Sequence, residues 1–246
     1  MITSSDNPTS RRLRQLASER EPGTVFLEGP RVVREAQALG VDLELVAVRE
    51  GDSFEASAAQ TVTLSRSLFR SLSQTVTPQG VFAIGKVSER SFREARVAAQ
   101  RAGWPLVVLD GVQDPGNVGT IIRSAVAAGA PAVVILPRTA DPFGPKAVRA
   151  SAGQVLRVVI ARASWGDFAG LRGMGASSRE GVPYQESAIE AGDFLVFGSE
   201  VHGLSGPEPS ASMDLVTVPM SDHVESLNVG AAAAVLLFEV RRRLTA

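Results

Sequence analysis

Five polar residues between positions 117 and 228 have side chains that could do chemistry. Each lies in a loop or near a helix start that follows a short apolar run. Arg123 is a lone charge among alanine, valine, isoleucine and glycine, and such an arginine either reaches out to water or is placed for an anion. The others offer amide, hydroxyl and carboxylate groups: Asn117, Glu200, Ser226 and Asn228. Together these groups could hold an anion beside hydrogen-bonding partners.

Taken one at a time, these residues have simpler interpretations. Asn117 and Ser226 are of the types that cap helices, and Glu200 alone is typical of a solvated loop carboxylate. Asn228 could bond to a nearby turn. A functional site is favoured because these residues occur together, close to the ends of three expected strands.

The elements that must position these residues are strands followed by loops. Apolar runs at 106–109, 194–197 and 215–218 predict buried strands, and further strands are expected at 133–136 and near 155–160. Strands that alternate with helices indicate an α/β fold. In open sheets of this class, ligands bind at the carboxyl ends of strands, which is where the polar residues lie.

The first of these strands leads into the most informative loop. A polar turn over 110–116 follows it, and Asn117 then stands where a helix cap belongs. The sequence predicts a helix over 118–128, closed by Gly129, and a last helix that follows Asn228 and runs through Arg243. The region 166–181 is rich in glycine and is expected to be less regular.

The amino-terminal part reads as a smaller α/β domain. Expected strands and helices alternate through it, and a charged segment separates it from the rest of the chain. We therefore expect a first domain at 1–87, a solvated helix or linker at 88–103 and a second domain at 104–246.

Several common chemistries are disfavoured because their sequence motifs are missing. The sequence has no GxxxxGK[ST], no GxGxxG after a strand and no GxSxG, which argues against P-loop ATP use, dinucleotide-dependent hydride transfer and serine hydrolysis. There is no cysteine, and the two histidines, His202 and His223, lack the spacing of metal ligands. We expect no metal.

Composition points to an ordinary globular protein. Hydrophobic residues make up 44% and charged residues 21% of the 246 residues, so disorder is not expected. No apolar run reaches the length of a membrane span, and the cytoplasm is the expected location. Because the net charge is only −1, any surface for a nucleic acid must be local. The candidates are Arg11, Arg12 and Arg14, with Arg31 and Arg34.

Three segments resemble the motifs of a known family. DGVQDPGNVGTIIRSAVAAGA, VFGSEVHGLS and VPMSDHVESLNVGAAAAVLLFEV are similar to the three motifs of the SpoU (TrmH) RNA ribose 2′-O-methyltransferases of the SPOUT class, and they occur in the family's order. More loosely, Asn7-Pro8 and FLEGPRVVREA resemble the extra substrate-binding domain of members that act on ribosomal RNA. That domain is similar to a small ribosomal protein.

The resemblance implies an S-adenosylmethionine-dependent enzyme, a trefoil knot in the second domain and a homodimer with its site close to the subunit interface. It implies that the substrate is RNA, with ribosomal RNA favoured over transfer RNA. The alternative is a non-catalytic RNA-binding or ribosome-assembly protein on the same fold. By resemblance the catalytic residues are Arg123, Asn117, Glu200 and Asn228, and the cofactor-binding residues are Gly198, Val218, Met220, Ser226 and Leu227.

The role of Arg123 has two interpretations. The family account often makes this arginine the base, assisted by an RNA phosphate. A guanidinium keeps its proton in proteins, which favours a different role. We expect Arg123 to be an electrostatic clamp that binds phosphate and stabilises the developing alkoxide, with Glu200 orienting it or balancing its charge.

Overall fold

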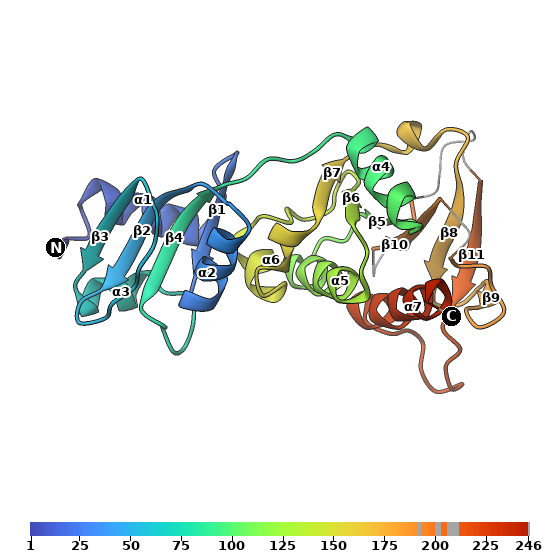
Figure 1. The fold of residues 1–246 in the computed structure, drawn as a ribbon. Coiled ribbons are helices and arrows are strands. Elements are labelled where there is room, and N and C mark those ends of the chain that lie inside the picture. Colours follow the sequence, from blue (N-terminus) through green and yellow to red (C-terminus); the bar gives the residue numbers. More distant parts are fainter. Residues whose placement is uncertain (191–192, 200–202, 206–211, 246) are drawn as a thin grey trace. The chain divides into compact units, whose positions relative to one another are not determined.

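The computed structural model describes residues 1–190, 193–199, 203–205 and 212–245, which fall into two compact units (Figure 1). The first unit comprises Met1–Ser88 and Pro142–Leu156, and the second comprises Glu89–Asp141 and Arg157–Ala246. Each unit has a sheet and an apolar core of its own. No helix within the described ranges has both the length and the apolar character needed to cross a membrane.

The first unit is a four-stranded sheet with helices. Its strands lie in the order β1-β4-β2-β3, in which β4 runs antiparallel to both of its neighbours and β2 pairs in parallel with β3. The strands are β1 (Thr24–Glu28), β2 (Leu43–Arg49), β3 (Gln60–Leu64) and β4 (Val81–Lys86). The helices are α1 (Pro8–Ser18), α2 (Pro30–Ala38), α3 (Arg66–Leu72) and α6 (Pro145–Ala150).

Helices α1 and α3 bury their apolar side chains against one face of this sheet. Leu13 of α1 is fully buried, and the Phe69 ring of α3 stacks on Phe82 of β4 with ring centroids 4.0 Å apart. Fully burying side chains of this size stabilises a fold by about 1.5–3 kcal/mol each. Helix α1 begins at Pro8 because the side chain of Asn7 accepts the backbone N–H of Thr9 at 2.9 Å, and proline fits the first turn.

The arginines of α1 do not share one environment. Arg12 hydrogen-bonds to both carboxylate oxygens of Glu44 and also pairs with Glu21. The hydrogen bond from Arg12 is the main reason that the pKa of Glu44 lies below its ordinary value. Arg11 and Arg14 are exposed. The positive charge of Arg12 is therefore already compensated within the unit.

The second unit is built on seven strands that all pair in parallel. Their order is β7-β6-β5-β10-β8-β11-β9. The strands are β5 (Leu106–Asp110), β6 (Ala132–Ile135), β7 (Val159–Arg162), β8 (Arg172–Ser177), β9 (Val182–Pro183), β10 (Phe194–Gly198) and β11 (Ser212–Thr217). The helices are α4 (Phe92–Ala102), α5 (Pro115–Ala128) and α7 (Val229–Leu244). The expected α/β fold is confirmed, and the trefoil knot stays a prediction.

Helices cover both faces of this sheet. Leu106 and Val108 of β5 lie in one core with Ala95 and Ala99 of α4, while α5 and α7 lie on the opposite face (Figure 1). The strand residues between them, such as Val107, point the other way because side chains alternate along a strand. Strands buried on both faces read as continuous apolar runs, which is why 106–109 and 194–197 were visible in the sequence.

The structure departs from the expected elements in three places. Two short 3₁₀ helices occur, η1 (Gln154–Arg157) and η2 (Trp165–Phe168), and because of η1 the strand expected near 155–160 begins only at Val159. The glycine-rich region expected to be irregular contains a strand, β8. Gly173 of this strand packs so closely on the Phe194 ring that a Cβ would clash with it. Within 88–103, α4 contributes two alanines to the core of the second unit.

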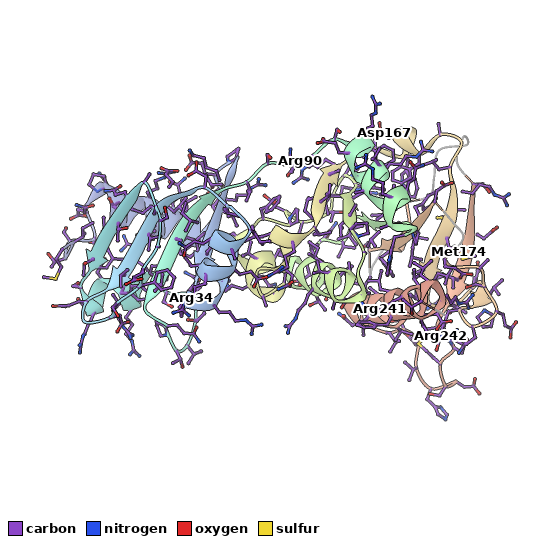
Figure 2. The ribbon with its side chains drawn as sticks, in the orientation of Figure 1. Arg34, Arg90, Asp167, Met174, Arg241 and Arg242 are labelled. Atoms are coloured by element: carbon purple, nitrogen blue, oxygen red, sulfur yellow. The ribbon has the colours of Figure 1, made fainter. Side chains whose placement is uncertain are left out.

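Helices α5 and α7 run parallel and are joined at their carboxyl ends. Arg241 of α7 (Figure 2) donates from Nη1 to the carbonyl oxygens of Ala127 and Ala128, each at 3.2 Å. These carbonyls are among the last of α5, which a helix leaves without partners of their own. Arg241 therefore interacts with the negative end of the neighbouring helix as well as lying near that of its own.

We expect the last turn of α7 to lose stabilisation in acid. Glu239 accepts hydrogen bonds from Arg242 and Arg243 at 2.7–2.8 Å, and the bond from Arg242 is the main cause that lowers the pKa of Glu239 from 4.5 to about 2. A carboxylate with a lowered folded-state pKa stabilises the fold fully above about pH 4.5, and this contribution disappears as the pH falls towards 2. Because Arg242 is exposed, we expect an effect of about 1 kcal/mol.

Urea unfolding at pH 6 and pH 3 measures this effect. The variant Glu239→Gln should be less stable than the wild type at pH 6, and the difference should shrink at pH 3. Glu225→Gln, in an exposed loop, is the control and should show no such pH dependence. An equal loss for Glu239→Gln at both pH values would contradict the assignment.

Candidate active site

The carboxyl ends of β5 and β10 lie side by side at the centre of the larger sheet. The chain leaves β5 towards β6 on one side, whereas β10 lies on the other, so the strand order reverses between them. Asp110 and Gly198, the last residues of the two strands, are paired in register. A reversal of this kind leaves a crevice at the carboxyl ends of the strands, where ligands bind in open α/β sheets.

Gly198 lies in close contact with the backbone of the residues that follow β10. A Cβ at this position would lie 2.5 Å from the carbonyl oxygen of Gly203 and 2.8 Å from the backbone nitrogen of Leu204. The contact is with backbone atoms, which cannot rotate away as a side chain can. Ser199 and Gly203 exchange backbone hydrogen bonds at 2.8 and 2.9 Å, so the chain turns back immediately after β10.

A buried carboxylate anchors the same loop. Asp110 is 3% exposed and accepts the backbone N–H of Ser205 at 2.6 Å and its hydroxyl at 2.8 Å. The hydroxyl oxygen of Ser205 also accepts the indole N–H of Trp165 at 2.9 Å. Sequence reasoning missed this network, because 95 residues separate Asp110 from Ser205. The one available signal is an acidic residue at the end of an apolar strand.

Asn117 and Asn228 are brought together across 111 residues of chain. The amide nitrogen of Asn228 donates to the side-chain oxygen of Asn117 at 3.0 Å. The side-chain oxygen of Asn228 accepts the backbone N–H groups of Gly230 and Ala231, so Asn228 is the N-cap of α7. Asn228 thus fixes its own amide and, through it, the amide of Asn117.

The sequence interpretation of Asn117 as a helix cap is wrong. The N-cap of α5 is Asp114, which accepts the backbone N–H of Asn117 at 3.0 Å, and the helix begins at Pro115. Asn117 lies within the first turn, so its side chain is available to Asn228. The cap interpretation of Ser226 is also wrong, because α7 begins after Asn228.

The amino ends of α5 and α7 also pack closely. A Cβ at Gly230 would lie 2.9 Å from the methyl group of Thr120, one turn after Asn117. Since Arg241 joins the carboxyl ends of the same two helices, they are held together at both ends. Both positive helix ends lie beside the asparagine pair.

Arg123 lies on the same helix but apart from the asparagine pair. It comes six residues after Asn117, which is about 9 Å along the helix axis. Its side chain is exposed, and within the described ranges no hydrogen bond or ion pair joins it to another residue. Glu200 lies outside the described residues. Of the four residues given catalytic roles by resemblance, the structure joins two.

The other residues assigned to the cofactor follow β11 and precede α7. Val218 and Met220 are half-buried, whereas Ser226 and Leu227 are exposed. Within the described part of the chain, no hydrogen bond to another main-chain group is made by the backbone of Val218 or Met220. These peptide groups therefore remain available to a ligand at the carboxyl edge of the sheet.

The whole chain aligns with known proteins. The profile of the SpoU rRNA Methylase family matches residues 105–238, and that of the MRM3-like substrate binding domain matches residues 7–83. The chain belongs to the SpoU family. It is 30% identical over 252 residues to the 23S rRNA (guanosine(2553)-2′-O)-methyltransferase RlmP of Bacillus subtilis, covering 98% of both chains.

Solved structures agree with this assignment to the SpoU family. The AdoMet-bound rRNA methyltransferase from Sinorhizobium meliloti is 29% identical, with a TM-score of 0.82 over 98% of this chain and 97% of that one. An RNA 2′-O ribose methyltransferase is 28% identical, with a TM-score of 0.81 over 100% and 99%. The protein is thus an RNA ribose 2′-O-methyltransferase that uses S-adenosylmethionine.

The carboxyl edge of this SpoU-family sheet fits the cofactor. The backbone around Gly203 packs directly on Gly198 at this edge, and the backbone groups near Val218 and Met220 have no main-chain partners within the described ranges. A ligand with an adenine and an amino-acid group needs both donors and acceptors, which peptide groups supply without side chains. This explains why the sequence shows no side-chain fingerprint for a nucleotide.

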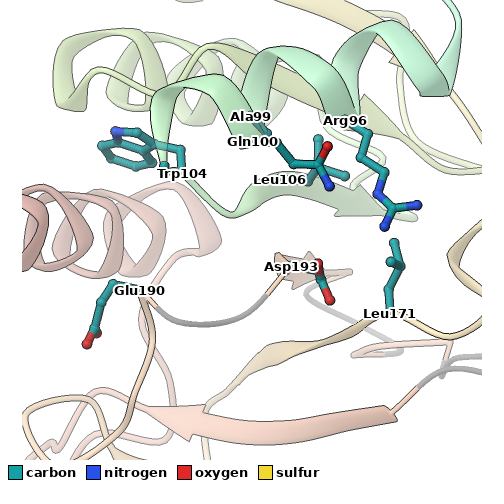
Figure 3. Close-up of a pocket in the computed structure, with 9 residues that line it drawn as sticks. Arg96, Ala99, Gln100, Trp104, Leu106, Leu171, Glu190 and Asp193 are labelled. Carbon is teal, nitrogen blue, oxygen red and sulfur yellow. The ribbon is translucent and has the colours of Figure 1, made fainter.

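A hollow of about 210 Å³ lies at the opposite edge of the SpoU-family sheet (Figure 3). It is bounded by α4 and by the starts of β5, β8 and β10. The Nε atom of Arg96 is buried there and has no hydrogen-bond partner among the described residues, whereas Asp193 accepts the backbone N–H of Arg172. None of the expected site residues lines this hollow.

The asparagine pair gives a prediction that separates activity from stability. In Asn228→Asp, the side chain can still cap α7, but it can no longer donate to Asn117. We expect methyl transfer to fall about tenfold because Asn117 loses the bond that orients its amide, and a bond between neutral groups contributes about 0.5–1.5 kcal/mol. The melting temperature should change little, because the cap on α7 is kept.

Asn228→Ala is the matched variant. It also loses the cap, which costs about 1 kcal/mol, so its melting temperature should fall by roughly 2–4 °C. Asn117→Ala combined with either change tests the coupling, because partners in one interaction give less than the sum of the single losses. Wild-type activity in Asn228→Asp would rule out a role for the pair.

Proposed function

We propose that this protein transfers the methyl group of S-adenosylmethionine to the 2′-hydroxyl of a guanosine ribose in 23S ribosomal RNA. The observation that carries the proposal is the junction of three motifs at one sheet edge. Asp110 and Gly198 meet at the strand reversal, and Asn117 meets Asn228 at the neighbouring helix ends. The choice of RNA is supported by RlmP of Bacillus subtilis, whose name specifies a guanosine of 23S rRNA.

The chain's own residues have to align the ribose and stabilise its oxygen. The planar fork of Arg123 binds a phosphate beside the target ribose and stabilises negative charge as the hydroxyl oxygen becomes nucleophilic. Asn117 and Asn228 present fixed amides, and Glu200 balances the guanidinium. When bound, S-adenosylmethionine supplies an activated methyl group, so that the oxygen gains a bond to carbon, the carbon–sulfur bond breaks and the hydroxyl proton passes to water.

We propose different roles for the two domains. We assign RNA binding to a domain at 1–87 and catalysis to one at 104–246, joined by 88–103. Two segments depart from these bounds, since Pro142–Leu156 belongs to the first unit and Glu89–Asp141, which includes α4, belongs to the second. The match of residues 7–83 to a substrate binding domain supports the first assignment. Because the substrate is proposed to be ribosomal RNA, we place the protein in the cytoplasm.

A homodimer completes the proposed site. Apolar side chains of α7 face solvent in the single chain, with Val235 38% and Phe238 48% exposed, and Leu227 just before the helix is 38% exposed. Contiguous exposed apolar surface marks association sites. An interface there would also place residues of the partner subunit around the exposed Arg123 on the adjacent α5. Light scattering during size-exclusion chromatography tests this, and a monomer at 50 µM would contradict it.

Methyl transfer to defined RNAs tests the function. Purified protein, S-adenosylmethionine with a tritiated methyl group and a 23S rRNA transcript of Bacillus subtilis should give labelled RNA. One guanosine should become resistant to alkaline cleavage, because the 2′-hydroxyl is then blocked. A 16S transcript and transfer RNA are the controls. Label in transfer RNA alone would overturn the choice of substrate, and RNA that is bound but unlabelled would indicate a non-catalytic binding protein.

A further inference from the structure

The first unit has a hollow of about 390 Å³ lined by three arginines and one aspartate. Arg49 lies at the end of β2, Arg66 and Arg70 lie on α3, and Asp52 lies in the turn after β2. The fully buried Phe69 and the loop residue Pro78 complete the lining. None of these three arginines stands out in the sequence.

Asp52 neutralises only one of the three arginines. It accepts a hydrogen bond from Nε of Arg49 at 2.9 Å and forms an ion pair with the same guanidinium. Arg49 also donates to the carbonyl oxygen of Pro78 at 3.3 Å, and its guanidinium lies 6.0 Å from the centre of the Phe69 ring. Arg49 is therefore fixed in place as part of the wall.

Arg66 is held in position by a neutral group and forms no ion pair among the residues that the structure describes. Its Nε donates to the backbone carbonyl oxygen of Glu50 at 3.3 Å, a neutral acceptor. Its Nη2 atom lies 2.8 Å from the point where a Cβ at Gly51 would stand, and Gly51 has a φ of +87°. The glycine therefore provides both the turn and the space for the guanidinium.

Arg70 repeats the charge one helical turn later. Residues four apart lie on the same side of a helix, and like charges at this spacing are destabilising by about 0.2–0.5 kcal/mol. Arg70 is exposed, and in the described part of the chain no hydrogen bond or ion pair engages its side chain. Two uncompensated guanidinium groups thus border one hollow, an arrangement that an anion would relieve.

The rest of the first unit offers little positive charge. The first unit as a whole contains 12 lysines and arginines against 10 aspartates and glutamates. Arg12 pairs with Glu44 and Glu21, and Lys86 pairs with Asp42 at 2.8 Å. RNA affinity depends on contacts between cations and phosphates, so the place where cations gather without counter-charges matters more than the total.

We propose that this hollow binds a phosphate of the RNA backbone with its adjoining ribose, through Arg66 and Arg70. The inference rests on the proposed function and specifies where the first unit binds its RNA substrate. The hollow is larger than a lone phosphate requires, and Val76, in the neighbouring loop before β4, is 99% exposed and available to the same RNA. Arg11 and Arg14 of α1 then have the lesser role.

A comparison of two double variants tests this location. R66Q/R70Q and R11Q/R14Q each remove two positive charges from the same unit. Binding of the 23S rRNA transcript is measured at several KCl concentrations without S-adenosylmethionine. R66Q/R70Q should weaken binding about tenfold at 0.1 M KCl and lower the salt slope by about 1, because one phosphate contact is lost. R11Q/R14Q should change affinity less than threefold.

Three outcomes would overturn the proposal: binding by R66Q/R70Q within twofold of the wild type, an equal or greater loss in R11Q/R14Q, or full competition by 20 mM inorganic phosphate at constant ionic strength. The last outcome would assign the hollow to a free anion. The single variant R70Q keeps the test valid if the double variant is unstable, because Arg70 is exposed. Methyl transfer is measured separately. A wild type that binds RNA without methylating it would refute the proposed function, and the binding experiment would still test the role of the hollow.

Discussion

Arg123→Lys is expected to lower the rate of methyl transfer about 100-fold or more at saturating RNA, although the positive charge remains. Lysine is a point charge and cannot bind phosphate with two parallel hydrogen bonds as guanidinium does. Loss of one group that stabilises developing negative charge typically costs about 10²–10³ in rate. The melting temperature should change little, because the Arg123 side chain is exposed and has no partner within the described ranges.

The pH dependence of the same variant distinguishes a clamp from a base. Lysine loses its proton near pH 10.4, so a general base at this position would recover activity as the pH rises from 8 to 10.5. An electrostatic clamp loses its charge over that range and shows no recovery. Arg101→Lys on α4, also exposed, is the control and should behave as the wild type. Near-normal turnover by Arg123→Lys at pH 8 would contradict the clamp.

Gly198→Ala is expected to lower the affinity for S-adenosylmethionine at least 100-fold and to destabilise the second unit by about 2 kcal/mol or more. The new methyl group would lie 2.5 Å from the carbonyl oxygen of Gly203, so the loop after β10 has to move away from the sheet edge. Overpacking of this kind typically costs about 1–3 kcal/mol. A displacement of about 1 Å in the residues that hold a ligand is enough to disrupt its binding and alignment.

Isothermal calorimetry with S-adenosylmethionine and urea unfolding measure the two effects. Gly166→Ala is the matched control, because a Cβ there would meet only the hydroxyl of Ser164 at 3.6 Å, an ordinary contact distance. We expect this control to keep its cofactor affinity. If Gly198→Ala bound the cofactor as tightly as Gly166→Ala, the crevice between β5 and β10 would not be the cofactor site.

The local pattern of the second unit could be predicted from the sequence because its strands are buried on both faces. Leu106–Asp110 and Phe194–Gly198 appeared as apolar runs, and the residues beyond them could be assigned to one sheet edge. The meeting of Asn117 with Asn228 agrees with that placement. The helix cap was missed although Asp114-Pro115 is a recognised start signal, an acidic N-cap followed by proline.

Long-range pairing could not be predicted, since periodicity carries no information about partners far apart in the chain. The contact of Asp110 with Ser205 depends on the position of β10 beside β5, and the strand order follows from tertiary packing. The arginine hollow has the same origin, because Arg49 and Arg66 come from different elements. In the sequence, the cluster of arginines in α1 was more visible, yet Arg12 there is bound to Glu44.

The interleaving of the two units along the chain sets an order for folding during synthesis. The first unit includes Pro142–Leu156, so the ribosome must complete residue 156 before that unit is whole. By then only β5 and β6 of the larger sheet have been made, and the central strand β10 follows about 40 residues later. At roughly 5–20 residues per second, the nascent chain exposes these two apolar strands for several seconds before their neighbour emerges.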